Sequence, residues 1–239
     1  MKRMAWLLAL ALTLIACSKE KDLEPPAELV DFTVKLKPDH VWSIGTKGGD
    51  AVLRLGLRPA VLDDRVYVAG HGGDVQALEL GSGHSLWRTS TDLDLSGGPA
   101  IGEGLVVAGT IAGQVLALDA GTGATRWQVA VGGEVLSAPA ISAGLAIVRT
   151  VDGKLKALRV ADGTEAWSYE QPVPKLTLRG NGAPIIDGDM VLAGFDSGKV
   201  VALALLTGDL LWTATVAPSR GRTEIERLAD IDSPVHVID

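Results

Sequence analysis

The segment "GQVLALDAGTGATRW", from Gly113 to Trp127, decides the fold because the chain repeats its pattern four times without a gap. Each copy begins with a glycine, continues with Ala-Leu, and reaches a second glycine and then a tryptophan at the same offsets. A proline precedes each copy, with 14 residues from the proline to the first glycine and 14 from that glycine to the tryptophan. Intervals held constant in four copies define an internal repeat, which covers residues 59–87, 99–127, 139–167 and 184–212.

Each repeat has the composition of short β-strands. In the second copy, "PAIG", "GLVVAG", "GQVLALDA" and "TRWQVAV" are rich in Val, Ile and Leu, and Gly, Ser, Thr or Asp separate them. Four antiparallel strands in a unit of about 40–45 residues form a β-propeller blade. No segment after residue 17 has a helical period. The sequence therefore predicts an all-β fold, a β-propeller with about four complete four-stranded antiparallel blades and further partial ones.

The glycines and tryptophans of the repeat have separate expected roles. The second glycine of each copy is predicted to have a positive φ in a tight hairpin. The tryptophan begins the outer strand and is predicted to pack between neighbouring blades. An alternative use of such tryptophans is a ring of platforms on which sugars or bases stack. The glycines are Gly83, Gly123, Gly163 and Gly208, and the tryptophans are Trp42, Trp87, Trp127, Trp167 and Trp212.

Two segments at the ends of the repeat region match only parts of a blade. Trp42, in "HVWSIG", has no preceding half-repeat and is predicted to lie in a lone outer strand. The segment "SPVHVID" (233–239) matches the first strand of another blade. We therefore expect residues 39–239 to form a partial propeller and the chain to be a fragment of a longer one, or the product of a truncated reading frame.

The N-terminus has the pattern of a bacterial lipoprotein signal. Lys2 and Arg3 precede an apolar run over 4–16 that is shorter than the roughly 20 residues that a membrane-spanning helix needs. The run ends in "LIAC", which resembles a lipobox and makes Cys17 the expected site of lipidation; an ordinary signal peptide with an unrelated cysteine is the alternative. We expect residues 1–16 to be the signal peptide and residues 17–38 to be a lipidated, flexible tether.

Charge and cysteine content exclude two classes of interaction. Without Lys2 and Arg3, 20 basic residues stand against 29 acidic ones, a net charge of −9. Phosphate backbones repel such a chain, so we expect no nucleic-acid partner. Cys17 is the single cysteine, so no disulfide forms within the chain.

Insertions break the repeat between blades. The interval from the tryptophan to the next proline is 12 residues after Trp87 and Trp127, but 17 after Trp167 and 22 after Trp212; after Trp42 it is also 17. Because antiparallel strands alternate in direction, both longer crossings of the adjacent last repeats leave the same face, and we expect them to form one surface.

The inserted residues include apolar and charged side chains: Leu176, Leu178 and Arg179 in the first insertion, Asp230 and Asp232 in the second. Exposed leucines beside charges are typical of a protein-binding patch. The alternative is that the leucines pack back onto the blade and the charges only solvate a loop.

On these motifs the chain resembles the BamB family. The resemblance covers the lipobox, the blade pattern, "LTLRG" (176–180) and "TEIERLADID" (223–232). It implies an eight-bladed propeller lipoprotein on the periplasmic face of the outer membrane, of which this chain has about half. It further implies a non-enzymatic scaffold of the β-barrel assembly machinery (BAM complex) that binds the POTRA domains of BamA and assists insertion of outer-membrane β-barrels. Other BAM subunits are further implied partners, and contact with unfolded client barrels is a hypothesis. The family's BamA-contacting motifs match Leu176, Leu178, Arg179, Asp230 and Asp232.

An enzyme is the second interpretation, because "ALDAGTGATRW" (117–127) also resembles the tryptophan-docking repeat of quinoprotein dehydrogenases. A fragment of a dehydrogenase dependent on pyrroloquinoline quinone would need a metal, a cofactor site and a catalytic acid. The four histidines have no metal-ligand spacing, and no HExxH, GxSxG or P-loop pattern occurs. The acids of "DIDS" lack the rest of a calcium loop. We therefore expect no catalytic residue, no cofactor and no metal site.

Overall fold

The structure is a computed structural model that describes residues 30–31, 35–48, 55–180, 182–223 and 225–237. The chain divides into two units, Met1–His40 and Val41–Asp239. The described part of the first unit is irregular, and the expected signal peptide 1–16 and Cys17 lie outside the described residues. No described residues form a helix of the length and hydropathy needed to cross a bilayer.

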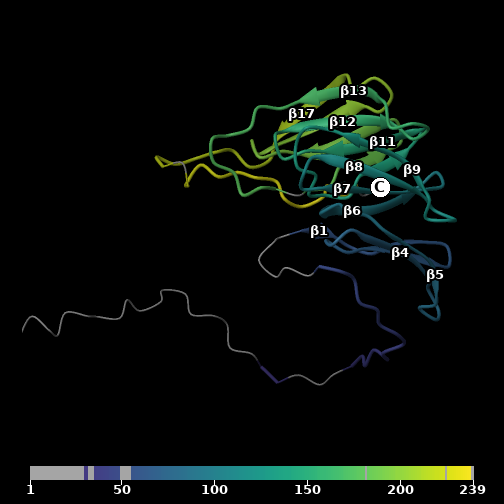
Figure 1. Cartoon of the computed structure of the whole chain (residues 1–239). Coiled ribbons are helices and arrows are strands. Elements are labelled where there is room, and N and C mark those ends of the chain that lie inside the picture. The colour runs from purple at the N-terminus through teal and green to yellow at the C-terminus, as the bar shows by residue number, and fades with distance from the viewer. Residues whose placement is uncertain (1–29, 32–34, 49–54, 181, 224, 238–239) are drawn as a thin grey trace, which may run out of the picture. The chain divides into compact units, whose positions relative to one another are not determined.

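The second unit contains four antiparallel sheets of four strands each, and each sheet comes from one sequence repeat (Figure 1). Blade 1 consists of β2 (Ala60–Leu62), β3 (Arg65–Ala69), β4 (Asp74–Glu79) and β5 (Ser85–Ser90). Blade 2 consists of β6 (Leu95–Gly102), β7 (Leu105–Thr110), β8 (Gln114–Asp119) and β9 (Thr125–Ala130). Blade 3 consists of β10 (Ala140–Ser142), β11 (Leu145–Arg149), β12 (Lys154–Arg159) and β13 (Glu165–Glu170). Blade 4 consists of β14 (Ile185–Asp187), β15 (Met190–Gly194), β16 (Lys199–Ala204) and β17 (Leu210–Thr215). The predicted all-β propeller blades are confirmed.

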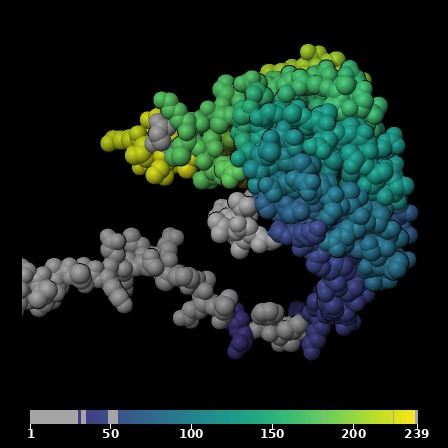
Figure 2. Space-filling model, in the orientation of Figure 1, coloured from purple at the N-terminus to yellow at the C-terminus, as the bar shows by residue number. Residues whose placement is uncertain are grey.

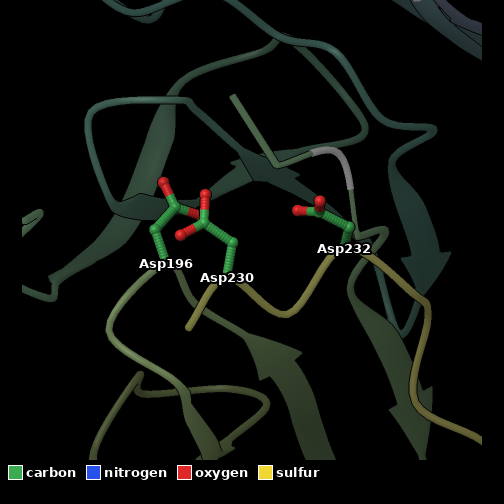
Figure 3. Close-up of side chains that lie close together, drawn as sticks. All are labelled: Asp196, Asp230 and Asp232. Carbon is green, nitrogen blue, oxygen red and sulfur yellow. The ribbon is translucent and has the colours of Figure 1, made fainter. Parts of the chain in front are cut away.

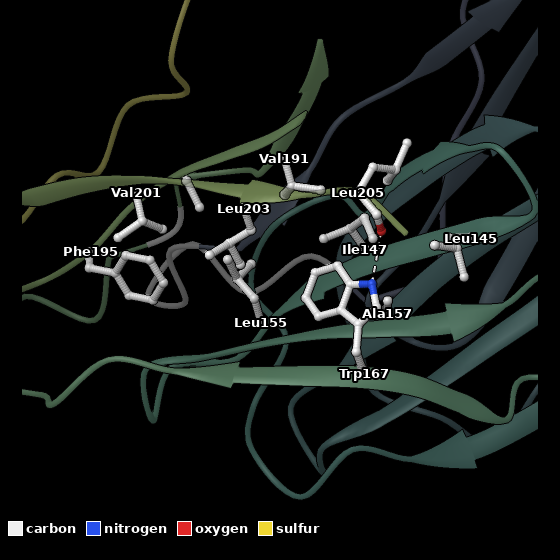
Figure 4. Packing of buried hydrophobic residues seen from close by; sticks show 11 residues of the cluster. Leu145, Ile147, Leu155, Ala157, Trp167, Val191, Phe195, Val201, Leu203 and Leu205 are labelled. Atoms are coloured by element: carbon white, nitrogen blue, oxygen red, sulfur yellow. Dashed lines mark hydrogen bonds between the residues drawn. The ribbon is translucent and has the colours of Figure 1, made fainter. Parts of the chain in front are cut away.

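The hydrophobic core lies between consecutive blades rather than within one. Successive side chains of a strand point to opposite faces, so Val106 of β7 packs toward blade 1 and Val107 packs toward blade 3. Between blades 3 and 4, Ile147 and Leu155 pack against Val191 and other apolar side chains (Figure 4). Both faces of the inner strands are therefore buried, which explains their nearly continuous apolar sequences.

The repeated Ala-Leu and tryptophan are explained by one irregularity of the sheet. Ala117 pairs with Trp127, and the register shifts between Ala117 and Leu118. The same shift occurs at the Ala-Leu pair of the other three blades. A β-bulge at this position increases the local twist and redirects the neighbouring side chains. The constant spacing between Ala-Leu and the tryptophan in the sequence therefore reflects a bulge at the same place in every blade.

Each tryptophan from Trp42 to Trp167 docks on the glycine turn of the following blade. The indole N–H of Trp127 donates to the carbonyl of Val160 at 2.8 Å, and a Cβ on Gly163 would lie 2.8 Å from the Trp127 ring. In the other three junctions the indole donates to the carbonyls of Leu80, Ala120 and Leu205 at 2.9, 3.0 and 2.8 Å. The four turn glycines have φ between 71° and 75°, which confirms their predicted conformation. Trp212 is 44% exposed.

Three details differ from the sequence expectations. Residues 41–46 form no strand, because no described strand pairs with this backbone. Trp42 nevertheless docks as the other tryptophans do. Residues 233–237 likewise form no strand. A two-residue strand that was not predicted, β1 (Gly56–Leu57), pairs in parallel with β6 and extends blade 2 to five strands.

Candidate functional site

The two inserted crossings lie side by side. The first, between β13 and β14, and the second, after β17, have no regular strands. The backbone N–H of Leu178 in the first donates a hydrogen bond to the Asp230 carboxylate in the second. In Figure 2 the green atoms of the first crossing lie beside the yellow atoms of the second. The direction of the blade strands predicted this meeting. We call Leu176, Leu178, Arg179, Asp230 and Asp232 together the inserted-crossing surface.

The two leucines do not pack back onto the blade. Leu176 is 42% exposed and Leu178 is 62% exposed, and Ile225 of the second crossing is also exposed. Leu176 lines an open groove of about 370 Å³ between the crossings, together with Asp196 and Ala229. Apolar side chains held in water beside a groove are a candidate protein contact.

Arg179 is directed by its backbone and by an ion pair. Its φ is 56°, in the left-handed region that few side-chain-bearing residues adopt. Its guanidinium lies 2.5 Å from the carboxylate of Glu134, which belongs to the crossing between blades 2 and 3. Both side chains are partly exposed. Arg179 therefore links a third crossing to the inserted-crossing surface.

Two members of the inserted-crossing surface, Asp230 and Asp232, approach the buried Asp196 (Figure 3). Carboxylate oxygens of the three residues all lie within 4.8 Å of one another. Burial raises the pKa of Asp196, the charges of Asp230 and Asp232 raise it further, and Arg149 opposes the shift. Loss of surrounding water and the charge of Asp230 also raise the pKa of Asp232, which is only partly covered. The cluster therefore holds several negative charges at an energetic cost.

Arg149 supplies the opposite charge. It ends β11, and its side chain is 2% exposed. One guanidinium nitrogen lies 2.6 Å from Asp196, and another donates to the carbonyl of Gly180 at 2.9 Å. Its central carbon lies 5.6 Å from the centre of the Phe195 ring, within the range of a cation–π contact.

The sequence interpretation missed Arg149 and Asp196. One signal was available, because Arg149 lies four residues before the first glycine of its repeat. The equivalent positions of the other repeats are Ala69, Gly109 and Gly194. Only blade 3 has an arginine at this position, and the other three blades have a small residue. A long crossing follows blade 3, so the arginine indicates a role other than packing between blades.

A grouping of three carboxylates has oxygens that a cation could share. Here the guanidinium of Arg149 already contacts Asp196, and Asp230 accepts the amide of Leu178. A Cβ on Gly180 would lie 2.2 Å from an Asp232 oxygen, so the first crossing approaches this carboxylate closely. In the described residues, the three aspartates therefore join β11 and the first inserted crossing to the second crossing and blade 4.

The family described as "Outer membrane protein assembly factor BamB" matches residues 71–239. A protein of that name from Pseudomonas aeruginosa is 57% identical over 229 residues, which are 95% of this chain and 60% of that protein. One from Xanthomonas campestris pv. campestris is 41% identical and covers 97% of this chain and 62% of the relative. The chain thus spans about three fifths of the length of these relatives.

Solved structures agree with this result. BamB from Moraxella catarrhalis superposes with a TM-score of 0.73 at 34% identity, over 78% of this chain and 57% of that one. A europium-containing methanol dehydrogenase superposes with a TM-score of 0.58 at 18% identity, over 73% of this chain and 43% of that one. At that identity the likeness to the dehydrogenase concerns the fold alone.

Proposed function

The chain belongs to the family of outer membrane protein assembly factor BamB, a family of non-enzymatic assembly factors, and from this premise we propose that it acts as a scaffold of the β-barrel assembly machinery. In this role it binds the periplasmic POTRA domains of BamA and assists the assembly and insertion of outer-membrane β-barrel proteins. The observation that carries the proposal is the inserted-crossing surface, in which exposed Leu176 and Leu178 are held beside the second crossing through Asp230.

The chemistry of this surface suits a folded protein partner. Protein interfaces combine a few large apolar contacts with a rim of polar and charged groups. Leu176 and Leu178 supply the apolar contacts, and Arg179 and Asp232 supply partly exposed charges of opposite sign at their edges. The partner would gain the burial of two leucine side chains, which contributes about 1.5–3 kcal/mol each when burial is complete.

The proposed location follows from the N-terminal segment. Residues 1–16 act as a signal peptide, Cys17 carries the lipid, and residues 17–38 tether the propeller segment 39–239 to the outer membrane on its periplasmic side. Other subunits of the machinery and unfolded client barrels are further proposed partners. The dehydrogenase alternative rests on a shared repeat and a shared fold, neither of which carries a reaction.

A binding measurement tests the proposal. The periplasmic domains of BamA are immobilised, and retention of the full chain is compared with that of Leu178→Ala and Arg179→Ala. Leu86→Ala is the matched control, because Leu86 is 45% exposed on β5 of blade 1. Weaker retention of both surface variants with unchanged retention of the control is expected. Equal retention of all four proteins would remove this surface as the BamA contact.

A further inference from the structure

We propose that Arg149 is a positioning residue for the inserted-crossing surface, which it holds together from beneath without contacting the partner. What the surface binds rests on the function proposed above, but the role of Arg149 within the fold does not. Its side chain is 2% exposed, so a partner on the outside cannot reach it.

Three structural elements converge on the guanidinium. Arg149 extends from β11 of blade 3, it donates to the carbonyl of Gly180 in the first inserted crossing, and it pairs with Asp196 in the turn between β15 and β16 of blade 4. Gly180 follows Arg179 directly, so this bond fixes the backbone that presents Arg179 and Leu178. A planar guanidinium suits this arrangement, because its donors point in fixed directions to separate acceptors.

The repeat shows what Arg149 replaces. In the crossing into blade 3, Val135 lies four residues before Pro139, the proline that begins the repeat. The Val135 side chain covers Gly109 of blade 2, because a Cβ on Gly109 would lie 2.2 Å from it. The crossing into blade 4 has Gly180 at that position, and Arg149 stands at the position of Gly109. The side chain that fills the junction therefore comes from the blade and not from the crossing. An apolar side chain, that of Val135, fills the junction between blades 2 and 3. Between blades 3 and 4, Arg149 fills it and donates a hydrogen bond to the first inserted crossing.

Arg149 also compensates the charge of the aspartate cluster. Other charged groups nearby are Arg227, which lines the groove with Asp196, and Arg58, which lines a small cavity with Asp232. Arg179 contacts Glu134 instead. Removing one partner of a buried ion pair leaves the other charge uncompensated. Without Arg149, repulsion would separate Asp196 from Asp230 and Asp232, and Asp230 would lose its position beside the Leu178 amide.

Amide hydrogen exchange and BamA binding of the full chain test this role through Arg149→Gln. The protection factor of the Leu178 amide should fall by about tenfold or more near pH 7.5, and binding to the periplasmic domains of BamA should weaken with it. Protection of Val75, a buried blade 1 residue, should not change. The control variant is Arg88→Gln, because Arg88 pairs with buried Asp74 at 3.1 Å in blade 1. Arg88→Gln should leave the protection factor of the Leu178 amide unchanged.

A pH series separates positioning from general destabilisation. As the pH falls from 7.5, protonation of cluster carboxylates with raised pKa values relieves their repulsion, so Arg149→Gln should recover Leu178 protection relative to the unaltered chain. Variants that merely weaken the fold would not recover. Should Arg149→Gln not fold, Arg149→Lys keeps the charge but not the two-acceptor geometry, and it should lose part of the protection.

The outcomes for the two proposals are distinct. Unchanged Leu178 protection in Arg149→Gln, or in Arg149→Lys if the first variant does not fold, would overturn the positioning role. Equal losses in Arg149→Gln and Arg88→Gln would overturn it as well. If the unaltered chain does not bind BamA domains while Leu178 protection depends on Arg149, the proposed function fails and the positioning role stands.

Discussion

Replacing Trp127 with alanine tests the packing that joins the blades. Trp127 is 7% exposed, its indole N–H donates to Val160 at 2.8 Å, and its ring lies against Gly163. A buried tryptophan replaced by alanine costs about 3–5 kcal/mol, and the Val160 carbonyl also loses its donor. For a fold of about 200 residues this corresponds to a fall of about 6–20 °C in the unfolding midpoint.

The control for this substitution is Trp212→Ala. Trp212 has the same place in its repeat, but it is 44% exposed, and no described residue accepts a hydrogen bond from its indole. Its removal should change the free energy of unfolding by less than about 1 kcal/mol. Urea unfolding followed by circular dichroism measures both variants. A loss below about 1 kcal/mol for Trp127→Ala, or equal losses at the two sites, would refute the packing argument.

Three further predictions address the turns, the aspartate cluster and the anchor. Gly123→Ala should destabilise by about 1–3 kcal/mol more than Gly104→Ala in thermal unfolding: both glycines have positive φ, but only at Gly123 would a Cβ meet a ring, that of Trp87 at 2.5 Å. Folding raises the pKa of Asp232 above 3.8, so the folded chain binds this proton more readily and the free energy of unfolding falls as pH rises through the raised pKa. Asp232→Asn should therefore gain stability relative to the unaltered chain as pH rises from 3.8 through the raised pKa in urea titrations, whereas a constant difference would contradict the shift. Cys17→Ser should abolish palmitate labelling in cells, and persistent labelling would exclude Cys17 as the anchor.

The repeat made most of the fold predictable. Neighbouring blades pack through the same bulge, glycine turn and tryptophan, so their spacing along the chain is constant and visible without coordinates. The contact between the two insertions was also predictable, because strand direction decides on which face a crossing emerges. β1 was not, since two residues carry no periodicity and their pairing with β6 depends on distant backbone.

The interior of the candidate site was harder to predict than its exterior. Leu176 and Leu178 stand out as apolar residues in a connector, whereas Asp196 lies in an ordinary turn. The ion pair of Arg179 with Glu134 joins residues 45 positions apart, and nothing in either segment specifies it. Arg149 differs from its counterparts in the repeat, but its two acceptors belong to other elements, so its role becomes visible only when those elements are placed.

Site-specific crosslinking in cells tests the central claim most directly. A photoreactive p-benzoylphenylalanine in place of Leu178 puts the reactive group on the inserted-crossing surface, and the same residue in place of Leu86 puts it on an exposed strand of blade 1. The proposed scaffold role predicts a crosslinked product with BamA from position 178 and none from position 86. Absence of the product at position 178, or equal products at both positions, would contradict it.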